Sequence, residues 1–70
     1  MKKFDKTTLG ELTIGDRFYF LGDTIKRVFE VKSIPGRRTD AKLIGTGRIV
    51  RKPSNTEVVF LTSKSEREAL

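Results

Sequence analysis

Hydrophobic and polar residues alternate in several short runs along the chain, and this alternation predicts an all-β protein. The runs DRFYFL (16–21) and IKRVFEVKSI (25–34) are rich in aromatic and β-branched side chains, which favour strands. Three more short strands are predicted at AKLIG (41–45), RIVRK (48–52) and TEVVFL (56–61). Residues typical of turns separate these runs, at Gly22-Asp23, Pro35-Gly36, Gly45-Thr46-Gly47 and Pro53-Ser54-Asn55.

The first two predicted strands are expected to form a hairpin in which Gly22 occupies the first central position of a type II′ turn. A two-residue turn there places Tyr19 opposite Lys26 and Phe18 opposite Arg27. Because side chains alternate along a strand, one face is predicted to form the core and carries Phe18, Phe20, Ile25, Phe29 and Val31. The other face carries Arg17, Tyr19, Leu21, Lys26, Val28, Glu30 and Lys32. Arg27 falls on the core face, so this register requires a bulge or a charged group that reaches water.

The two ends of the chain carry helical signals. In TTLGELTIGD (7–16), Thr8 stands three residues before Glu11, which predicts a capping box and one short helical turn. In the tail TSKSEREAL (62–70), Ser63 precedes Glu66 by the same spacing, which is compatible with one frayed helical turn or with a disordered terminus. The sequence therefore predicts one domain over residues 1–70, with an ordered core at about 9–61.

Five short strands with turns about every eight to twelve residues indicate a small antiparallel barrel, since closing the sheet removes exposed edges. The lead-in LGELTIGDRFYF (9–20) and the turn before the last strand in PSNTEVVFL (53–61) resemble small SH3-like barrels of bacterial and phage origin, many of which have no assigned function. The resemblance covers about residues 9–61. It implies a five-stranded antiparallel SH3-like barrel with a short N-terminal helical turn. OB-folds share such lead-ins, so the alternative is that the barrel closes as an OB-fold does.

The charge of the chain is the main indication of a partner. Fifteen Lys and Arg residues against nine Asp and Glu residues give a formal net charge of +6. Nine basic residues lie between Lys26 and Lys52, where only Glu30 and Asp40 oppose them. Such an excess attracts polyanions, because each phosphate contact releases counterions from a nucleic acid. The alternative without a binding partner is that the charge serves solubility alone.

Catalytic chemistry is difficult to assemble from this composition. The chain has no Cys and no His, so it lacks disulfides, thiolate nucleophiles, thiolate metal ligands and imidazole acid–base groups. The carboxylates Asp16, Asp23, Asp40 and Glu57 fall at turns or strand starts, where their usual partners are local backbone N–H groups. The Gly-x-Gly pattern at 45–47 precedes a β-type run, which favours a hairpin turn over a phosphate cradle. We therefore expect a non-enzymatic protein with no cofactor and no metal site.

Two groups of residues are candidates for nucleic-acid binding. On the outer face of the predicted hairpin, Tyr19 lies between Arg17 and Lys26, an arrangement in which bases stack on the ring while the cations hold the backbone. The second group supplies charge directed at phosphates and comprises Arg37, Arg38, Arg48, Arg51 and Lys52. The alternatives are that Tyr19 packs against one of the termini and that the loop arginines belong to a solvated turn.

The sequence thus predicts binding of DNA or RNA through the backbone with low sequence specificity. The competing hypothesis is a protein-interaction module, such as an accessory part of a larger assembly, with an acidic protein partner. A proline-rich peptide is disfavoured as a ligand, because the chain has one Tyr and no Trp. The apolar strand EVVFLT (57–62) is compatible with a monomer or a weak homo-oligomer.

The cellular location is expected to be cytoplasmic. The first residues, MKKFDKTTLG (1–10), contain a basic pair without the apolar run of a signal peptide. No window approaches the ~18 apolar residues of a membrane span, so membrane contact is not expected.

Overall fold

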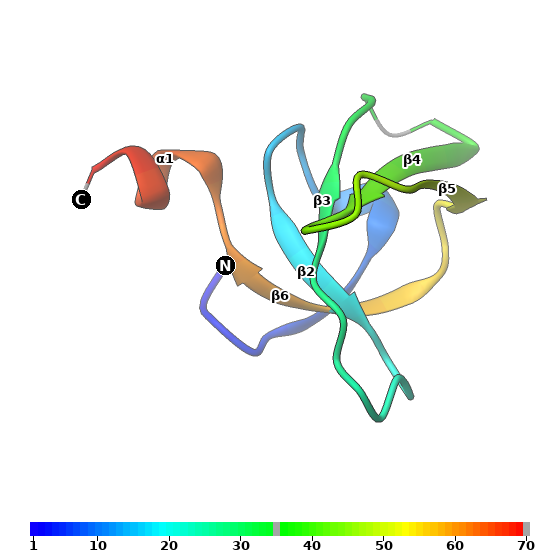
Figure 1. Cartoon of the computed structure of the whole chain (residues 1–70), viewed down its shortest axis with the longest axis horizontal. Helices are drawn as coiled ribbons and strands as arrows, with labels where there is room; N and C mark the ends of the chain where they lie inside the picture. The colour runs from blue at the N-terminus through cyan, green and yellow to red at the C-terminus, as the bar shows by residue number, and fades with distance from the viewer. Residues whose placement is uncertain (35, 70) are drawn as a thin grey trace.

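The computed structural model describes residues 1–34 and 36–69, and in them a single antiparallel sheet curls into a half-barrel (Figure 1). The strands are β1 (Lys6–Thr8), β2 (Arg17–Phe20), β3 (Phe29–Val31), β4 (Arg38–Leu43), β5 (Ile49–Pro53) and β6 (Glu57–Thr62). A 3-10 helix, η1 (Leu9–Glu11), follows β1, and a short helix, α1 (Lys64–Glu68), follows β6. Pro35 of the predicted Pro35-Gly36 turn and Leu70 of the tail lie outside the described residues.

The strand order is β1-β6-β2-β3-β4-β5. Strands β2 to β5 form a meander and β6 returns beside β2, so the prediction of an all-β antiparallel fold is confirmed. The predicted number of five strands is wrong, because β1 adds a sixth strand by pairing with β6, with Lys6 opposite Val59. The residues of β1, Lys-Thr-Thr, have no apolar alternation, and their pairing depends on the neighbouring β6.

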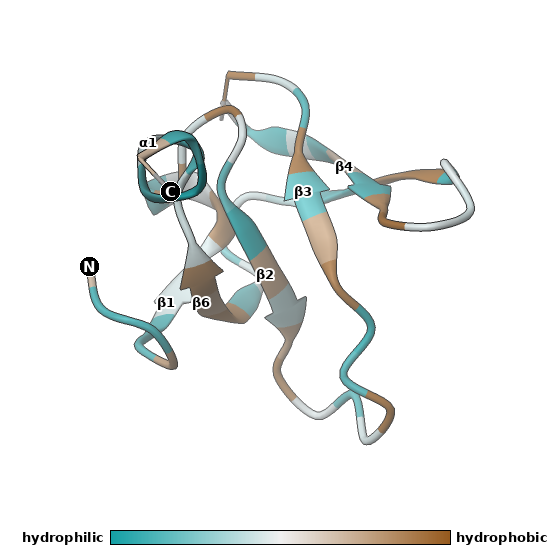
Figure 2. Cartoon of the chain, turned by 60° about the vertical axis from the view of Figure 1, so that its left-hand side comes forward, coloured by the Kyte–Doolittle hydropathy of each residue, from teal (hydrophilic) through white to brown (hydrophobic). Residues whose placement is uncertain are grey.

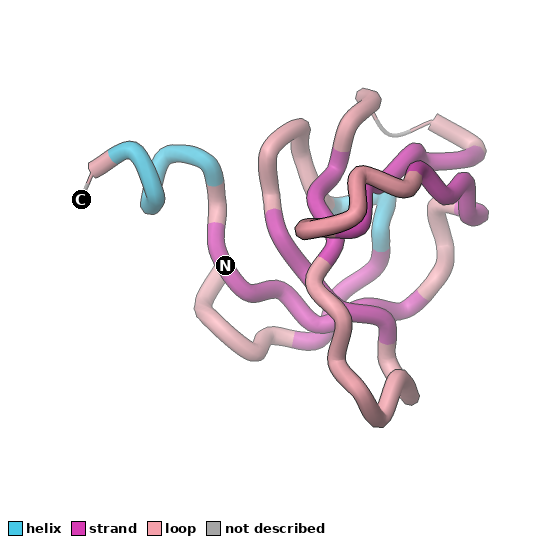
Figure 3. The backbone as a smooth tube through the Cα atoms, viewed as in Figure 1, coloured by secondary structure: helices cyan, strands magenta, loops and turns pink. Residues whose placement is uncertain are grey.

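The two predicted capping boxes have different outcomes. Helix η1 confirms the helical turn near the N-terminus, but the Thr8 side chain makes no capping hydrogen bond. Glu11 instead accepts a hydrogen bond from the Thr7 hydroxyl at 2.7 Å. The C-terminal helix follows the end of β6 (Figure 3). Before this helix, the Ser63 hydroxyl accepts from the Glu66 N–H at 3.1 Å and the Glu66 carboxylate accepts from the Ser63 N–H at 3.2 Å. This complete capping box starts α1.

The hairpin between β2 and β3 differs from the prediction in its loop and its register. Phe18 pairs with Phe29 and not with Arg27, a shift of two residues, so the predicted two-residue turn is wrong. Residues 21–28 form the loop between the two strands. Ile25, predicted to lie in the core, is 74% exposed in this loop.

The prediction of the core face is confirmed for the residues that lie in β2 and β3, because side chains alternate with a period of two residues and a shift of two leaves each on its own side. Phe18, Phe29 and Val31 are buried, and Phe20 is half-buried. Figure 2 shows hydrophobic and hydrophilic residues following one another along β2 and β3. The rest of the core comes from η1 and the other strands and includes Leu9, Leu12, Ala41, Val58 and Phe60. Buried Thr39 shares a hydrogen bond of 2.9 Å with Ser54, which joins the start of β4 to the turn before β6.

An ion cluster on the outer face of the sheet joins β2, β3 and α1. Glu30, whose side chain is 14% exposed, accepts hydrogen bonds from Lys32 at 2.6 Å, Arg17 at 3.1 Å and Arg67 at 3.3 Å. Arg67 also donates to the Thr62 hydroxyl at 2.8 Å and to the Gly15 carbonyl. The hydrogen bond from Lys32, followed by that from Arg17, holds the pKa of Glu30 below its usual range against the opposing effect of desolvation.

Glu30→Gln is therefore expected to lower the free energy of unfolding at neutral pH by about 1 to 2 kcal/mol, because charge-assisted hydrogen bonds are replaced by weaker ones. Since the pKa of Glu30 is lowered by folding, its contribution is complete above its ordinary pKa of 4.5 and is lost as pH falls below that value. Urea unfolding at a series of pH values measures this. The wild type should lose more stability than Glu30→Gln in acid, and parallel pH profiles would contradict the assignment.

Candidate functional site

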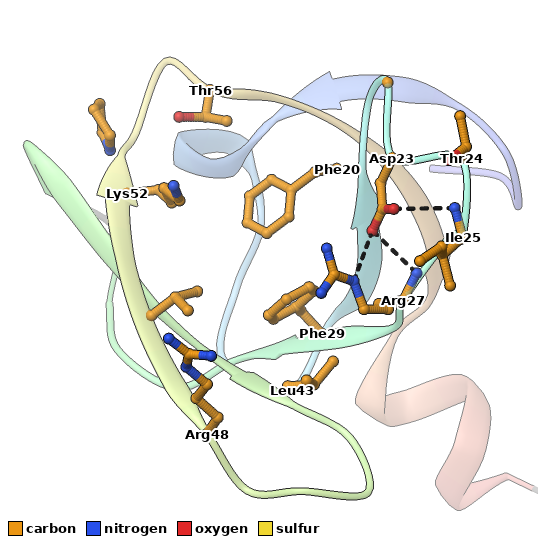
Figure 4. A pocket seen from close by; sticks show the side chains of 13 residues that line it. Phe20, Asp23, Thr24, Ile25, Arg27, Phe29, Leu43, Arg48, Lys52 and Thr56 are labelled. Atoms are coloured by element: carbon orange, nitrogen blue, oxygen red, sulfur yellow. Dashed lines mark hydrogen bonds and ion pairs between the residues drawn. The ribbon is translucent and has the colours of Figure 1, made fainter.

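An open groove lies between the loop 21–28 and the hairpin of β4 and β5 (Figure 4). Its volume is about 860 Å³, which falls in the roughly 300–1,000 Å³ range typical of ligand sites. Its lining consists of Phe20, Gly22, Asp23, Thr24, Ile25, Arg27, Phe29, Leu43, Arg48, Val50, Lys52, Pro53 and Thr56. The groove therefore brings together a loop and two strands that are distant in the sequence.

The floor of the groove is aromatic and aliphatic. Phe20 projects into it from the end of β2, and Phe29 and Leu43 lie beside it (Figure 4). Val50 also lines the groove. The ring of Phe20 meets the ring of Phe29 at a centroid distance of 4.9 Å and an interplanar angle of 66°. Phe20 is half-buried, so part of its ring stays accessible from the groove.

The rim of the groove is cationic. Arg27 comes from the loop 21–28, and Arg48 and Lys52 come from the hairpin opposite. Strand alternation explains which side chains of β5 line the groove. Val50 and Lys52 line it, whereas Arg51 between them forms an ion pair with Asp40 at 2.7 Å. Of the described residues, Asp23 is the one acid that lines the groove.

Asp23 organises the loop that carries Arg27. Its carboxylate accepts hydrogen bonds from the backbone N–H of Ile25 at 3.1 Å, from the backbone N–H of Arg27 at 3.3 Å and from Arg27 Nε at 3.3 Å. Desolvation raises the pKa of Asp23, but these hydrogen bonds outweigh it and leave the pKa below its usual value. Gly22 and Lys26 both adopt positive φ angles, of 91° and 58°. The hydrogen bonds to the Asp23 side chain thus order the loop and hold Arg27 at the groove.

The structure brings two of the predicted site residues, Arg48 and Lys52, into the groove. Arg17 instead belongs to the outer ion cluster with Glu30. Arg51 is paired with Asp40, whose hydrogen bond raises the pKa of the guanidinium.

The other predicted residues lie away from the groove lining. Tyr19 is half-buried on the outer face, and the ammonium of Lys26 lies 5.9 Å from the centroid of its ring. The predicted closeness of these two residues is therefore present, although the loop produces it and not strand pairing. Arg37 and Arg38 are exposed at the start of β4.

The groove residues that were not predicted as site residues include Phe20, a ring of the floor, and Arg27, one of the three rim cations. Phe20 was placed in the core and Arg27 at a defect of the predicted register. The sequence does contain one signal for the real loop: Asp23 precedes Ile25 by two residues, the spacing at which an aspartate side chain accepts a hydrogen bond from the backbone. The same residues, Gly22 and Asp23, also fit a tight two-residue hairpin turn, so the local sequence does not distinguish the two structures.

No group of three or more acidic residues within 1–34 and 36–69 is arranged to hold a metal ion. None of the described helices has the length and apolar character needed to cross a membrane. Comparison with models of protein families, with curated proteins and with solved structures finds no match.

Proposed function

We propose that this protein is a non-enzymatic nucleic-acid-binding module that contacts the phosphate backbone with low sequence specificity through the groove. The observation that carries the proposal is the cationic rim of Arg27, Arg48 and Lys52 around a partly accessible aromatic floor. Cations beside an aromatic platform suit a strand of nucleic acid, because phosphates pair with the cations while bases contact the ring.

The charges available in the groove support this proposal. Neither Arg48 nor Lys52 forms an ion pair with a carboxylate of the described residues. Both side chains are therefore available to pair with an anionic partner. The carboxylate of Asp23 is occupied by Arg27 and by the loop backbone, so it opposes an incoming phosphate less than a free acid would.

We also propose that the half-barrel is of the SH3-like type that the lead-in and the closing strand resemble. Five strands that are neighbours in the sheet, in the order β6-β2-β3-β4-β5, support this proposal. A small five-stranded barrel requires such a meander with a last strand that returns beside the first. Strand β1 is then an addition at the edge of β6.

An acidic protein is the second candidate partner. Ile25 favours it, because this apolar side chain is 74% exposed at the groove and has no evident role in contacts with phosphate. Exposed apolar residues surrounded by charge are typical of protein interfaces.

Removal of the two unpaired rim cations is expected to weaken nucleic-acid binding and to reduce its salt dependence. For the double variant Arg48→Gln/Lys52→Gln, the slope of log affinity against log salt concentration should become shallower by about 1.4, at about 0.7 per lost contact with a single strand. Fluorescence anisotropy of a labelled oligonucleotide at several salt concentrations measures the slope. The matched control is Lys2→Gln/Lys3→Gln, which removes the same charge from exposed residues outside the groove.

The control separates a groove from general attraction by a basic protein. If the two double variants lower affinity and slope equally, the groove is not the binding site. If the wild type binds neither DNA nor RNA at low salt, the proposed function is wrong. Binding of an acidic peptide in place of nucleic acid, lost in Arg48→Gln/Lys52→Gln, would favour the second candidate.

A further inference from the structure

We infer that the groove is selective for single-stranded nucleic acid and holds one unpaired base against the ring of Phe20. This inference rests on the proposed function and specifies its ligand. It follows from the geometry of the aromatic floor, from the placement of the three rim cations and from the lack of a free acceptor carboxylate among the described residues that line the groove.

Phe20 differs from its aromatic neighbours in having no parallel partner among them. Phe18 and Phe29 are nearly parallel to each other, with an interplanar angle of 21° and a centroid distance of 6.0 Å. Both cross Phe20 steeply, at 87° and 66°. Phe18 and Phe29 are also buried, whereas Phe20 is only half-buried and projects into the groove (Figure 4). Neither ring is therefore stacked parallel on Phe20, and we take the part of its half-buried ring that lines the groove as the stacking position.

A base can use that position only when it is unpaired. In a duplex the faces of the bases are covered by their neighbours in the stack, and a ring at the floor of a groove meets only base edges or phosphates. In a single strand a base can turn towards the ring, and base–aromatic stacking is insensitive to the identity of the base. The floor of the groove is therefore expected to increase the affinity for single strands and to add little to the affinity for duplexes.

The rim cations fit a strand that passes over Phe20. Arg48 and Lys52 are four residues apart on one wall, a separation of about 13 Å in extended chain, so they reach different phosphates of the same strand. Arg27 stands on the other wall, and Nε is the one guanidinium nitrogen that is bonded to Asp23. Its terminal amino groups donate to no described residue, and its side chain is 57% exposed. One base between these walls would thus be flanked by positive charge on both sides.

The same groove is less suited to a peptide. A peptide brings backbone N–H donors as well as acidic side chains, and those donors require acceptors. The single carboxylate in the described lining belongs to Asp23 and is already occupied by three hydrogen bonds. A nucleic-acid backbone presents phosphate acceptors, which match the donors of Arg27, Arg48 and Lys52.

The experiment uses the absence of Trp from the sequence. Phe20→Trp introduces a single indole into the groove and keeps an aromatic ring for stacking, and Phe4→Trp places one on an exposed residue beside Lys3 outside it. We expect oligo(dT) to quench the fluorescence of Phe20→Trp in a saturable manner and to leave Phe4→Trp nearly unchanged. A hairpin duplex of equal phosphate content should quench Phe20→Trp weakly.

Affinity provides the second readout. Phe20→Leu keeps an apolar side chain but removes the ring, and it is expected to weaken binding of oligo(dT) about tenfold, the lower part of the range for one stacked base. Affinity for the duplex should change less than about twofold. Circular dichroism and urea unfolding establish that the variant is folded before affinities are compared.

The outcomes distinguish the inference from the function on which it rests. Equal affinity of the wild type for single strand and duplex, with no loss in Phe20→Leu, would overturn the inference and leave nucleic-acid binding intact. No binding of either probe at low salt would overturn both. Quenching by an acidic aromatic peptide without quenching by oligo(dT) would replace the single strand with a protein partner.

Discussion

Phe18→Ala is expected to leave the protein largely unfolded at 25 °C. Phe18 is fully buried at the centre of the core, where its ring is nearly parallel to Phe29 and makes a T-shaped contact with Phe20. Truncation of a buried phenylalanine costs about 3 to 5 kcal/mol, and a single core in a chain below about 80 residues rarely supplies more than that. The loss is therefore comparable to the whole free energy of unfolding.

Urea unfolding followed by circular dichroism measures this loss. The matched control is Phe4→Ala, which removes the same ring from a residue that is 63% exposed. We expect the control to change the free energy of unfolding by less than about 0.5 kcal/mol. A cooperative transition in Phe18→Ala, with a loss below about 1 kcal/mol, would show that the sheet does not depend on this ring.

Gly15→Ala is expected to lower the free energy of unfolding by about 2 to 3 kcal/mol and to release α1 from the sheet. Gly15 has a φ angle of +94°, which strains an L residue. A Cβ at this position would also lie 2.7 Å from the Cβ of Lys64 at the start of α1. The helix must then move, which breaks the hydrogen bond from Arg67 to the Gly15 carbonyl and weakens the link to Glu30.

Gly45→Ala is the matched control, because Gly45 has a similar φ of +102° and open space where the new Cβ would lie. It should cost only the backbone strain, about 1 kcal/mol. Hydrogen exchange of the amides in α1 should accelerate in Gly15→Ala and stay unchanged in Gly45→Ala. A double variant with Lys64→Gly, which removes the obstructing Cβ, should cost less than the sum of the two single changes. Equal losses in the two alanine variants would exclude the contact with α1.

The basic residues of the chain lie in different surroundings. Arg17, Lys32 and Arg67 converge on Glu30 at the outer face, and Arg51 forms an ion pair with Asp40. The rim of the groove carries the cations that we propose to meet phosphate, and Arg37 and Arg38 are exposed at the start of β4. The excess of basic residues between Lys26 and Lys52 is therefore not one patch.

Local features of the fold could be predicted because their causes lie within a few residues. The capping box of Ser63 and Glu66 needs only a spacing of three residues, and the positive φ angles of Gly22, Gly45 and Gly47 follow from glycines at predicted turns. The inward face of β2 and β3 was also correct, since alternation depends only on the parity of each position.

The register of the hairpin could not be predicted by the same means. A tight turn at Gly22-Asp23 and a longer loop closed by the Asp23 side chain are both compatible with the local sequence. The pairing of Phe18 with Phe29 is favoured by the buried ring cluster that both residues enter, and the cluster exists only once the sheet has curled. In the predicted register Arg27 would have taken the position opposite Phe18, where its charge would face the core.

The all-β character of the chain, its excess of basic residues and the inward orientation of Phe18, Phe29 and Val31 were predictable, because turn chemistry, alternation and net charge are properties of the chain. The pairing of β1 with β6, the ion pairs of Glu30 and Asp40, and the meeting of Phe20 and Arg27 with Arg48 and Lys52 in one groove were not predictable. These outcomes depend on contacts between residues far apart in the sequence, and curling of the sheet sets those contacts.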